Sequence, residues 1–148
     1  MTSAPALTAR GIQLNCTASS REEAVRLCGQ KLLECGAIEQ PYIDAMWERE
    51  LLMSSFIGEQ TAIPHGTDVS RKFVNFAQLV FLRYQNPVDW EGDEVRLTIG
   101  IASANDDHVD TLGVIAEILL DPTHRNIIFS SNDENEILDL VQKAFDKE

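Results

Sequence analysis

The chain has 148 residues, with 12 basic and 24 acidic side chains, so its formal net charge at pH 7 is −12. This charge repels phosphate backbones and anionic lipid headgroups, which argues against nucleic acids and membrane surfaces as partners. The length is that of one domain, large enough to bury a hydrophobic core without disulfides or metal ions.

The first ten residues are small and weakly patterned, so we expect residues 1–10 to form a flexible N-terminus and residues 11–148 to form the domain. The terminus lacks the basic and apolar regions of a signal peptide. No apolar run in the sequence approaches the ~20 residues that cross a bilayer. We therefore expect a cytoplasmic protein without membrane insertion.

Two helices are predicted in the first third of the chain. Ser20 and Glu23 have the spacing of a capping box, and the apolar repeat that follows ends at Gly36, which can adopt the left-handed conformation of a helix stop. A second helix is predicted from Pro41, a residue tolerated in the first turn, to about Met53.

The three cysteines, Cys16, Cys28 and Cys35, lie in the N-terminal quarter of the chain. Their odd number and the absence of a C-x-x-C spacing argue against a zinc site and a disulfide framework. We expect them to be small buried residues in a reducing compartment.

Strand and helix patterns alternate in the second half of the chain. With the two N-terminal helices they favour an α/β fold, a single layered domain with a central mixed β-sheet flanked by helices. Residues 74–84 and 95–102 predict strands, and Asn-Pro and Glu-Gly-Asp at residues 86–94 predict a connection between them. Three helices are predicted after them, from Asn105 to before Pro122, near residues 124–129, and after the capping box of Ser131 and Glu134.

His65 stands between Pro64 and Gly66. Proline fixes its own φ and restricts the residue before it, while glycine permits a turn or the close approach of another molecule, so the backbone is defined on both sides of the imidazole. Such a loop suits a reactive side chain. An ordinary turn with an incidental histidine has the same three residues, so this motif alone does not decide the function.

Two further residues are candidates for the same site as His65. Arg49 lies on the second predicted helix, where a solvated helix face with local ion pairs is the alternative. His108 lies in the first turn of the third predicted helix, where the helix dipole disfavours the imidazolium. His124 has no such setting and is expected on the surface. The histidines do not form a ligand cluster, so we expect no metal site.

Together these segments resemble the mannitol/fructose-type enzyme IIA domains of the bacterial phosphoenolpyruvate-dependent sugar phosphotransferase system. The family's Gly-Glu-x-x-Ala-Ile-Pro-His-Gly loop is matched by residues 58–66, its helix arginine by Arg49, and its second histidine by His108. The resemblance extends from about residue 11 to residue 141. It implies a phosphotransferase that forms a phosphohistidine intermediate and needs no cofactor.

By this resemblance His65 accepts a phosphoryl group from the carrier protein HPr and passes it to a cysteine of the enzyme IIB domain of a membrane sugar permease. Arg49 and His108 are implied to bind phosphoryl oxygens. Glu59 is expected to orient His65 or to contact Arg49. An acidic surface also suits a carrier with a basic docking face.

Four more residues are expected at the binding surface of the loop. A backbone N–H beside Gly66 can donate to the phosphoryl group. Apolar side chains near the loop can form a docking patch, although core packing is the alternative for them. The residues expected here are Gly66, Thr67, Phe56 and Ile63.

The sequence does not identify the sugar. The segments 56–59, 64–67 and 90–94 resemble the mannitol branch of the family. The alternative within the family is a nitrogen-related regulatory enzyme IIA that acts as a phosphorylation-dependent binding module. A binding module whose histidine is never phosphorylated is a further alternative. A histidine-dependent hydrolase is disfavoured, because no serine or cysteine is placed as a nucleophile beside the histidine.

Overall fold

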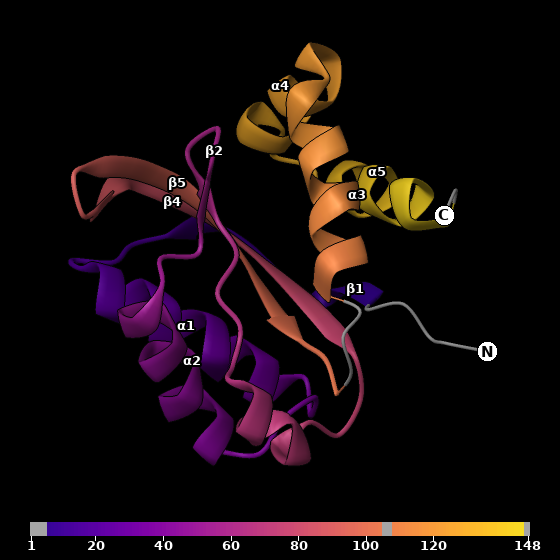
Figure 1. Cartoon of the computed structure of the whole chain (residues 1–148). Helices are drawn as coiled ribbons and strands as arrows, with labels where there is room; N and C mark the ends of the chain where they lie inside the picture. The colour runs from indigo at the N-terminus through magenta and orange to yellow at the C-terminus, as the bar shows by residue number, and fades with distance from the viewer. Residues whose placement is uncertain (1–5, 105–107, 147–148) are drawn as a thin grey trace.

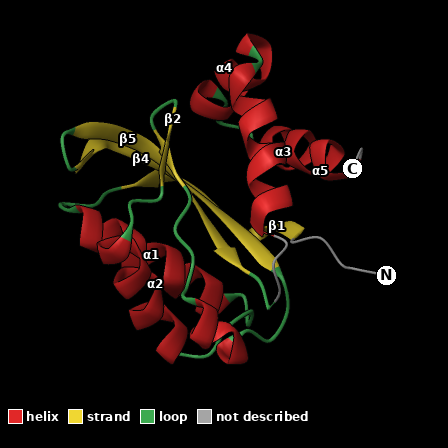
Figure 2. Ribbon diagram, viewed as in Figure 1, coloured by secondary structure: helices red, strands yellow, loops and turns green. Residues whose placement is uncertain are grey.

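A five-stranded mixed sheet lies at the centre of the fold in the strand order β1-β4-β5-β3-β2 (Figure 2). The computed structural model describes residues 6–104 and 108–146, and for residues 108 and 109 the backbone alone. Pairing is parallel for β1 with β4 and for β3 with β5, and antiparallel for the other two neighbours. The strands are β1 (Ala6–Cys16), β2 (Phe56–Gly58), β3 (Thr61–Ala62), β4 (Gln78–Trp90) and β5 (Asp93–Ala102).

Helices cover both faces of the sheet (Figure 1). The first two helices lie on one face and the last three on the other, and each group packs on its own cluster of buried apolar residues. The predicted α/β layered domain is therefore confirmed. The helices are α1 (Arg21–Glu34), α2 (Pro41–Leu52), α3 (His108–Leu120), α4 (Pro122–Ser130) and α5 (Glu134–Asp146).

Local signals set the ends of the first two helices as predicted. The Oγ of Ser20 accepts the N–H of Glu23 at 3.1 Å, which satisfies a donor in the first turn of α1. Gly36 follows α1 with a φ of 82°. Pro41 is the first residue of α2. Among the described residues, no helix is long and apolar enough to cross a membrane.

The predicted flexible N-terminus is wrong for residues 6–10, because they belong to β1. Ala6 pairs with Gln78 and Leu7 with Leu79. The pairing register shifts between Leu7 and Ile12, so the strand lacks the regular alternation that predicts one. Residues 1–5 lie outside the described part of the chain.

The predicted connection at residues 86–94 is also wrong over most of its length. β4 continues through Pro87 to Trp90, and the turn consists of Glu91 and Gly92, whose φ values are 56° and 100°. The register shifts between Arg83 and Val88, which places the proline at an irregularity where no ladder donor is required.

The last three helices are close to their predicted positions. α4 begins after Asp121, whose Oδ1 accepts the N–H groups of Thr123 and His124. The expected cap of α3, Asn105, lies outside the described residues. A short 3₁₀ helix that the sequence did not predict, η1 (Asp68–Phe73), follows the Pro-His-Gly loop directly.

Candidate phosphoryl-transfer site

The Pro-His-Gly loop lies against the end of β5. It leaves β3, and His65 pairs with Ile101 in an isolated parallel bridge. The N–H of Ile101 donates to the carbonyl of Pro64 at 2.9 Å. The sheet therefore fixes the backbone on the N-terminal side of the imidazole, as the proline suggested.

A backbone carbonyl fixes Nδ1 of the His65 imidazole. Its Nδ1 lies 2.9 Å from the carbonyl oxygen of Ile63, two residues earlier. A carbonyl can only accept, so in the neutral ring the proton is on Nδ1 and the lone pair is on Nε2. The outer nitrogen of this partly buried ring is thus the one whose lone pair could act as a nucleophile.

Tyr42 of α2 fixes the other side of the loop. Its hydroxyl donates to the carbonyl of Ile101 at 2.9 Å and accepts the N–H of Gly66 at 2.9 Å. Burial raises the pKa of Tyr42 to about 12, so the hydroxyl keeps its proton at neutral pH. The N–H of Gly66 itself is donated to Tyr42, so the expectation of a backbone phosphoryl donor beside Gly66 stays a prediction for the neighbouring N–H groups.

A polar cavity of about 260 Å³ lies beside His65. Arg49 of α2 and Arg71 of η1 both line it, so two arginines from different elements border the cavity beside the histidine. Such a cavity suits an anion with several oxygen atoms, because each guanidinium offers a planar set of N–H donors. The other lining residues are Tyr42, Gly66, Thr67, Asp68, Ile101 and Ser103.

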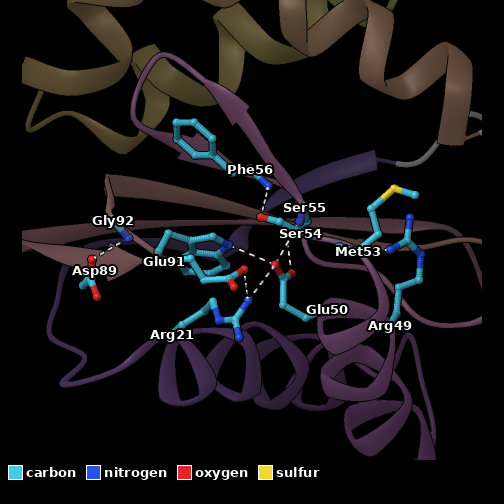
Figure 3. A network of polar contacts seen from close by, with 11 residues as sticks. Arg21, Arg49, Glu50, Met53, Ser54, Ser55, Phe56, Asp89, Glu91 and Gly92 are labelled. Atoms are coloured by element: carbon cyan, nitrogen blue, oxygen red, sulfur yellow. Dashed lines mark hydrogen bonds and ion pairs between the residues drawn. The ribbon is translucent and has the colours of Figure 1, made fainter.

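Hydrogen bonds orient both arginines. Nη1 of Arg49 donates to the carbonyl of Met53 at 2.9 Å, at the end of its own helix (Figure 3). Nη2 of Arg71 donates to Oδ1 of Asp68 at 3.1 Å. These bonds orient each guanidinium, a planar group with five N–H donors.

Residues 6–144 match the family model described as "Phosphoenolpyruvate-dependent sugar phosphotransferase system, EIIA 2". The chain belongs to this enzyme IIA family. It is therefore a component of a phosphotransferase system, as the sequence motifs predicted.

Named relatives and solved structures agree with this assignment. The mannitol-specific phosphotransferase enzyme IIA component of Halalkalibacterium halodurans is 36% identical over 132 residues, which cover 89% of this chain and 91% of the relative. The crystal structure of IIA mannitol from Escherichia coli is 33% identical, with a TM-score of 0.84 over 90% of this chain and 97% of that one. The complex of mannitol enzyme IIA with phosphorylated enzyme IIB from Escherichia coli gives 30% identity and a TM-score of 0.84, over 92% and 96% of the two chains.

Glu59 of this enzyme IIA is placed differently from the expectation. It lies at the tip of the β2–β3 hairpin with a φ of 50°, and its Oε2 is 3.3 Å from Nη1 of Arg125 on α4. The carboxylate therefore contacts the C-terminal helical layer, whereas a contact with His65 or Arg49 was expected. Sequence spacing did not indicate this pairing, because the hairpin and α4 meet only in the folded chain.

The expected apolar docking patch is also placed differently. Ile63 is 5% exposed and belongs to the core, and Phe56 is partly buried against the cluster beneath α1 and α2. The side chains of Leu52, Met53 and Val69 are instead 79%, 66% and 79% exposed. These three residues are close to Arg49 or His65 in sequence.

Five cavity residues were not predicted as site residues from the sequence: Tyr42, Asp68, Arg71, Ile101 and Ser103. One signal was available for Tyr42, which precedes Arg49 by two helical turns and therefore shares its helix face. Thr67 lines the cavity as expected. His108 is the first residue of α3, and its side chain lies outside the described residues.

Within the described part of the chain, no group of three or more His, Cys, Asp or Glu side chains could hold a metal ion. His124 is on the surface side of α4, with Nδ1 3.7 Å from Oδ2 of Asp121. Of the two histidines whose side chains the structure describes, His65 is the one beside the cavity.

Proposed function

We propose that this enzyme IIA accepts a phosphoryl group from phosphorylated HPr on Nε2 of His65 and passes it to a cysteine of an enzyme IIB domain during sugar uptake. The observation that supports this most directly is the bond from Nδ1 of His65 to the carbonyl of Ile63. It leaves the Nε2 lone pair beside a cavity with two guanidinium groups.

The two transfers are chemically balanced without a cofactor. In the first, the Nε2 lone pair attacks phosphorus, an N–P bond forms on His65, and the N–P bond of the donor histidine breaks and returns an electron pair to its nitrogen. In the second, a cysteine thiolate attacks, an S–P bond forms, and Nε2 recovers its lone pair. The proton on Nδ1 is retained throughout.

Phosphoryl transfer passes through a loose transition state with negative charge spread over the equatorial oxygens. The protein therefore mainly positions the reacting groups and neutralises the charge on these oxygens. Arg49 and Arg71 are proposed to supply that positive charge from opposite ends of the loop. His108 is proposed as a further donor, as the family resemblance implied. Glu59 is proposed to act only indirectly, by holding the hairpin that leads to the loop.

The partners and the sugar are proposed from the relatives. Relatives named for mannitol support the mannitol branch over the nitrogen-related regulatory branch. The Escherichia coli complex supports an enzyme IIB partner. The exposed side chains of Leu52, Met53 and Val69 are proposed to contact both partners in turn in the cytoplasm, because each partner must reach the same Nε2 atom.

Intact-mass spectrometry after incubation with phosphoenolpyruvate, enzyme I and HPr tests the proposal. The wild type should gain one acid-labile phosphoryl group, and His65→Ala should gain none. His124→Ala is the matched control, because that ring lies on α4 away from the cavity, and it should be phosphorylated like the wild type. The absence of a gain in the wild type would favour a binding module that is never phosphorylated.

A further inference from the structure

Glu50, the residue after Arg49, carries a carboxylate that is 2% exposed. Oε1 accepts the hydroxyl of Ser55 at 2.5 Å, and Oε2 accepts the N–H of Ser55 at 2.8 Å and Nε1 of Trp90 at 2.9 Å. Figure 3 shows this carboxylate pointing at Ser55, between the end of α2 and the strands behind it. Burying a carboxylate is costly unless several donors meet it, as they do here.

One path leads from this carboxylate to Arg49. Glu50 binds both the backbone and the side chain of Ser55, which fixes the short segment that follows α2. That segment includes Met53, whose carbonyl accepts Nη1 of Arg49 at 2.9 Å. The position of the guanidinium therefore depends on a segment that Glu50 holds.

A second path leads from Ser55 to the nucleophile. The carbonyl of Ser55 accepts the N–H of Ile63 at 3.0 Å. The carbonyl of Ile63 in turn accepts Nδ1 of His65 at 2.9 Å. Two consecutive hydrogen bonds thus connect Ser55 with the imidazole, and the second one selects its tautomer.

The remaining contacts of the carboxylate lead away from the cavity. Trp90 ends β4 on the far hairpin. Nη1 of Arg21 is 4.0 Å from Oε2 of Glu50 and 2.7 Å from Oε1 of Glu91, and its guanidinium lies over the ring of Trp47 with 5.1 Å to the centroid. These contacts fix the carboxylate itself against α1 and the sheet.

We propose that Glu50 is a positioning residue that, through Ser55, fixes the Arg49 guanidinium and the His65 imidazole in position relative to each other. This inference rests on the proposed phosphoryl transfer at His65. Glu50 has no contact with the cavity, so it acts through its neighbours. A displacement of about 1 Å in reacting groups can slow a reaction by about a hundredfold, which makes such a device effective.

Two matched variants separate positioning from stability. Ser55→Ala and Trp90→Phe each remove one donor to the same carboxylate, the first on the path to the site and the second on the path away from it. In single-turnover transfer from phosphorylated HPr at saturating donor, Ser55→Ala should be slower by about tenfold and Trp90→Phe by less than about twofold. The donor concentration that gives the half-maximal rate should not change, because the exposed docking residues are intact.

Glu50 itself gives a graded test. Glu50→Ala should slow transfer more than Ser55→Ala does. Glu50→Gln should restore most of the rate, since its amide oxygen can accept both N–H groups while its NH₂ donates to the Ser55 hydroxyl. If Glu50→Ala does not fold, the other variants decide. Equal rates for Ser55→Ala and wild type, or equal slowing by Ser55→Ala and Trp90→Phe, would overturn the proposal.

A measurement that does not depend on phosphoryl transfer distinguishes this proposal from the proposed function. In ¹⁵N NMR of the imidazoles, wild type and Trp90→Phe should hold the His65 proton on Nδ1, and Ser55→Ala should move part of the population to the other tautomer. A wild type that takes up no phosphoryl group would reject the proposed function, and the NMR comparison would still decide the positioning role. An unchanged tautomer in both Ser55→Ala and Glu50→Ala would reject the path from Ser55 to His65, because Ser55→Ala alone keeps the backbone N–H and carbonyl of that residue.

Discussion

The Nδ1 atom of His65 lies 2.9 Å from the carbonyl oxygen of Ile63. This short contact within one loop decides which nitrogen of the ring can react, because a backbone carbonyl accepts and never donates. Ile63 is itself 5% exposed, and its N–H is bonded to Ser55, so the carbonyl is not free to move away. The proposed nucleophile is therefore preorganised before any partner binds.

This geometry predicts that the phosphoryl group resides on Nε2 of His65. Scalar coupling between ³¹P and ¹⁵N in the phosphorylated, imidazole-labelled protein measures the site directly. We expect coupling to Nε2 and an intact proton on Nδ1. Coupling to Nδ1 would mean that the hydrogen bond to Ile63 breaks during transfer and that the resting tautomer does not select the nitrogen that is phosphorylated.

Arg49→Gln should slow phosphoryl transfer by about a hundredfold, because loss of one donor to a developing charge typically costs this much. Rapid-quench measurement of phosphoryl uptake from HPr gives the rate. Arg26→Gln is the matched control, since Arg26 pairs with Glu22 and Asp44 on the exposed face of α1. Transfer at the wild-type rate by Arg49→Gln would remove this residue from the site.

Arg71→Gln should also slow transfer, by about tenfold, because its guanidinium already shares charge with Asp68. Asp68→Asn removes the negative charge beside that guanidinium, and we expect it to leave the transfer rate unchanged or to raise it. The same rapid-quench measurement tests both variants. If Arg71→Gln transfers as fast as Arg26→Gln, Arg71 only borders the cavity and does not bind the phosphoryl group.

Tyr42→Phe should lower the free energy of unfolding by about 1–3 kcal/mol, because it leaves the N–H of Gly66 and the carbonyl of Ile101 without their shared partner. Transfer should slow as well, since the loop loses a fixed point beside His65. Urea unfolding and transfer rates measure the two effects.

Tyr84→Phe is the control for Tyr42. It removes a buried hydroxyl that contacts Thr98 at 2.8 Å, away from the loop. Its cost in stability should be similar, with no cost in transfer. Equal transfer rates for the two variants would show that Tyr42 contributes to stability alone.

Structural features that depend only on residues close in sequence could be predicted. The ends of α1 follow from Ser20 and Gly36, because caps are local hydrogen bonds and local φ values. β2 and β3 were missed because strands of three and two residues show no periodicity. The predicted strand ended at residue 84 because Asn86 and Pro87 indicated a break, although an irregular register allows a proline within β4.

The residues of the site also fall into two groups, those that their sequence context indicates and those that it does not. His65 and Arg49 have distinctive sequence contexts and line one cavity in the fold. Arg71 has no such context, because it lies on the short 3₁₀ helix η1, which was not predicted from the sequence. Glu59 shares the family's loop motif with His65, yet it contacts Arg125 on the opposite helical layer. The sequence motifs therefore predicted the type of chemistry better than they predicted the contacts between side chains.

The buried thiols predict a loss of stability at high pH. Burial raises the pKa of Cys28 from its ordinary value of 9.0 to about 12, and that of Cys16 from 9.0 to about 11. The unfolded chain loses both protons near pH 9, whereas the folded chain keeps them, so each group favours unfolding above that pH. This costs about 1.4 kcal/mol per pH unit for each group until its folded pKa is reached.

Urea unfolding across the alkaline range checks this prediction. Below about pH 9 the two thiols should add no slope to the free energy of unfolding, and above it the slope should be steeply negative. Cys28→Ala removes one of the two groups, so its curve should be shallower by about 1.4 kcal/mol per pH unit, whatever the cost of the cavity it leaves. Parallel curves for Cys28→Ala and wild type would mean that Cys28 is not the group that resists ionisation.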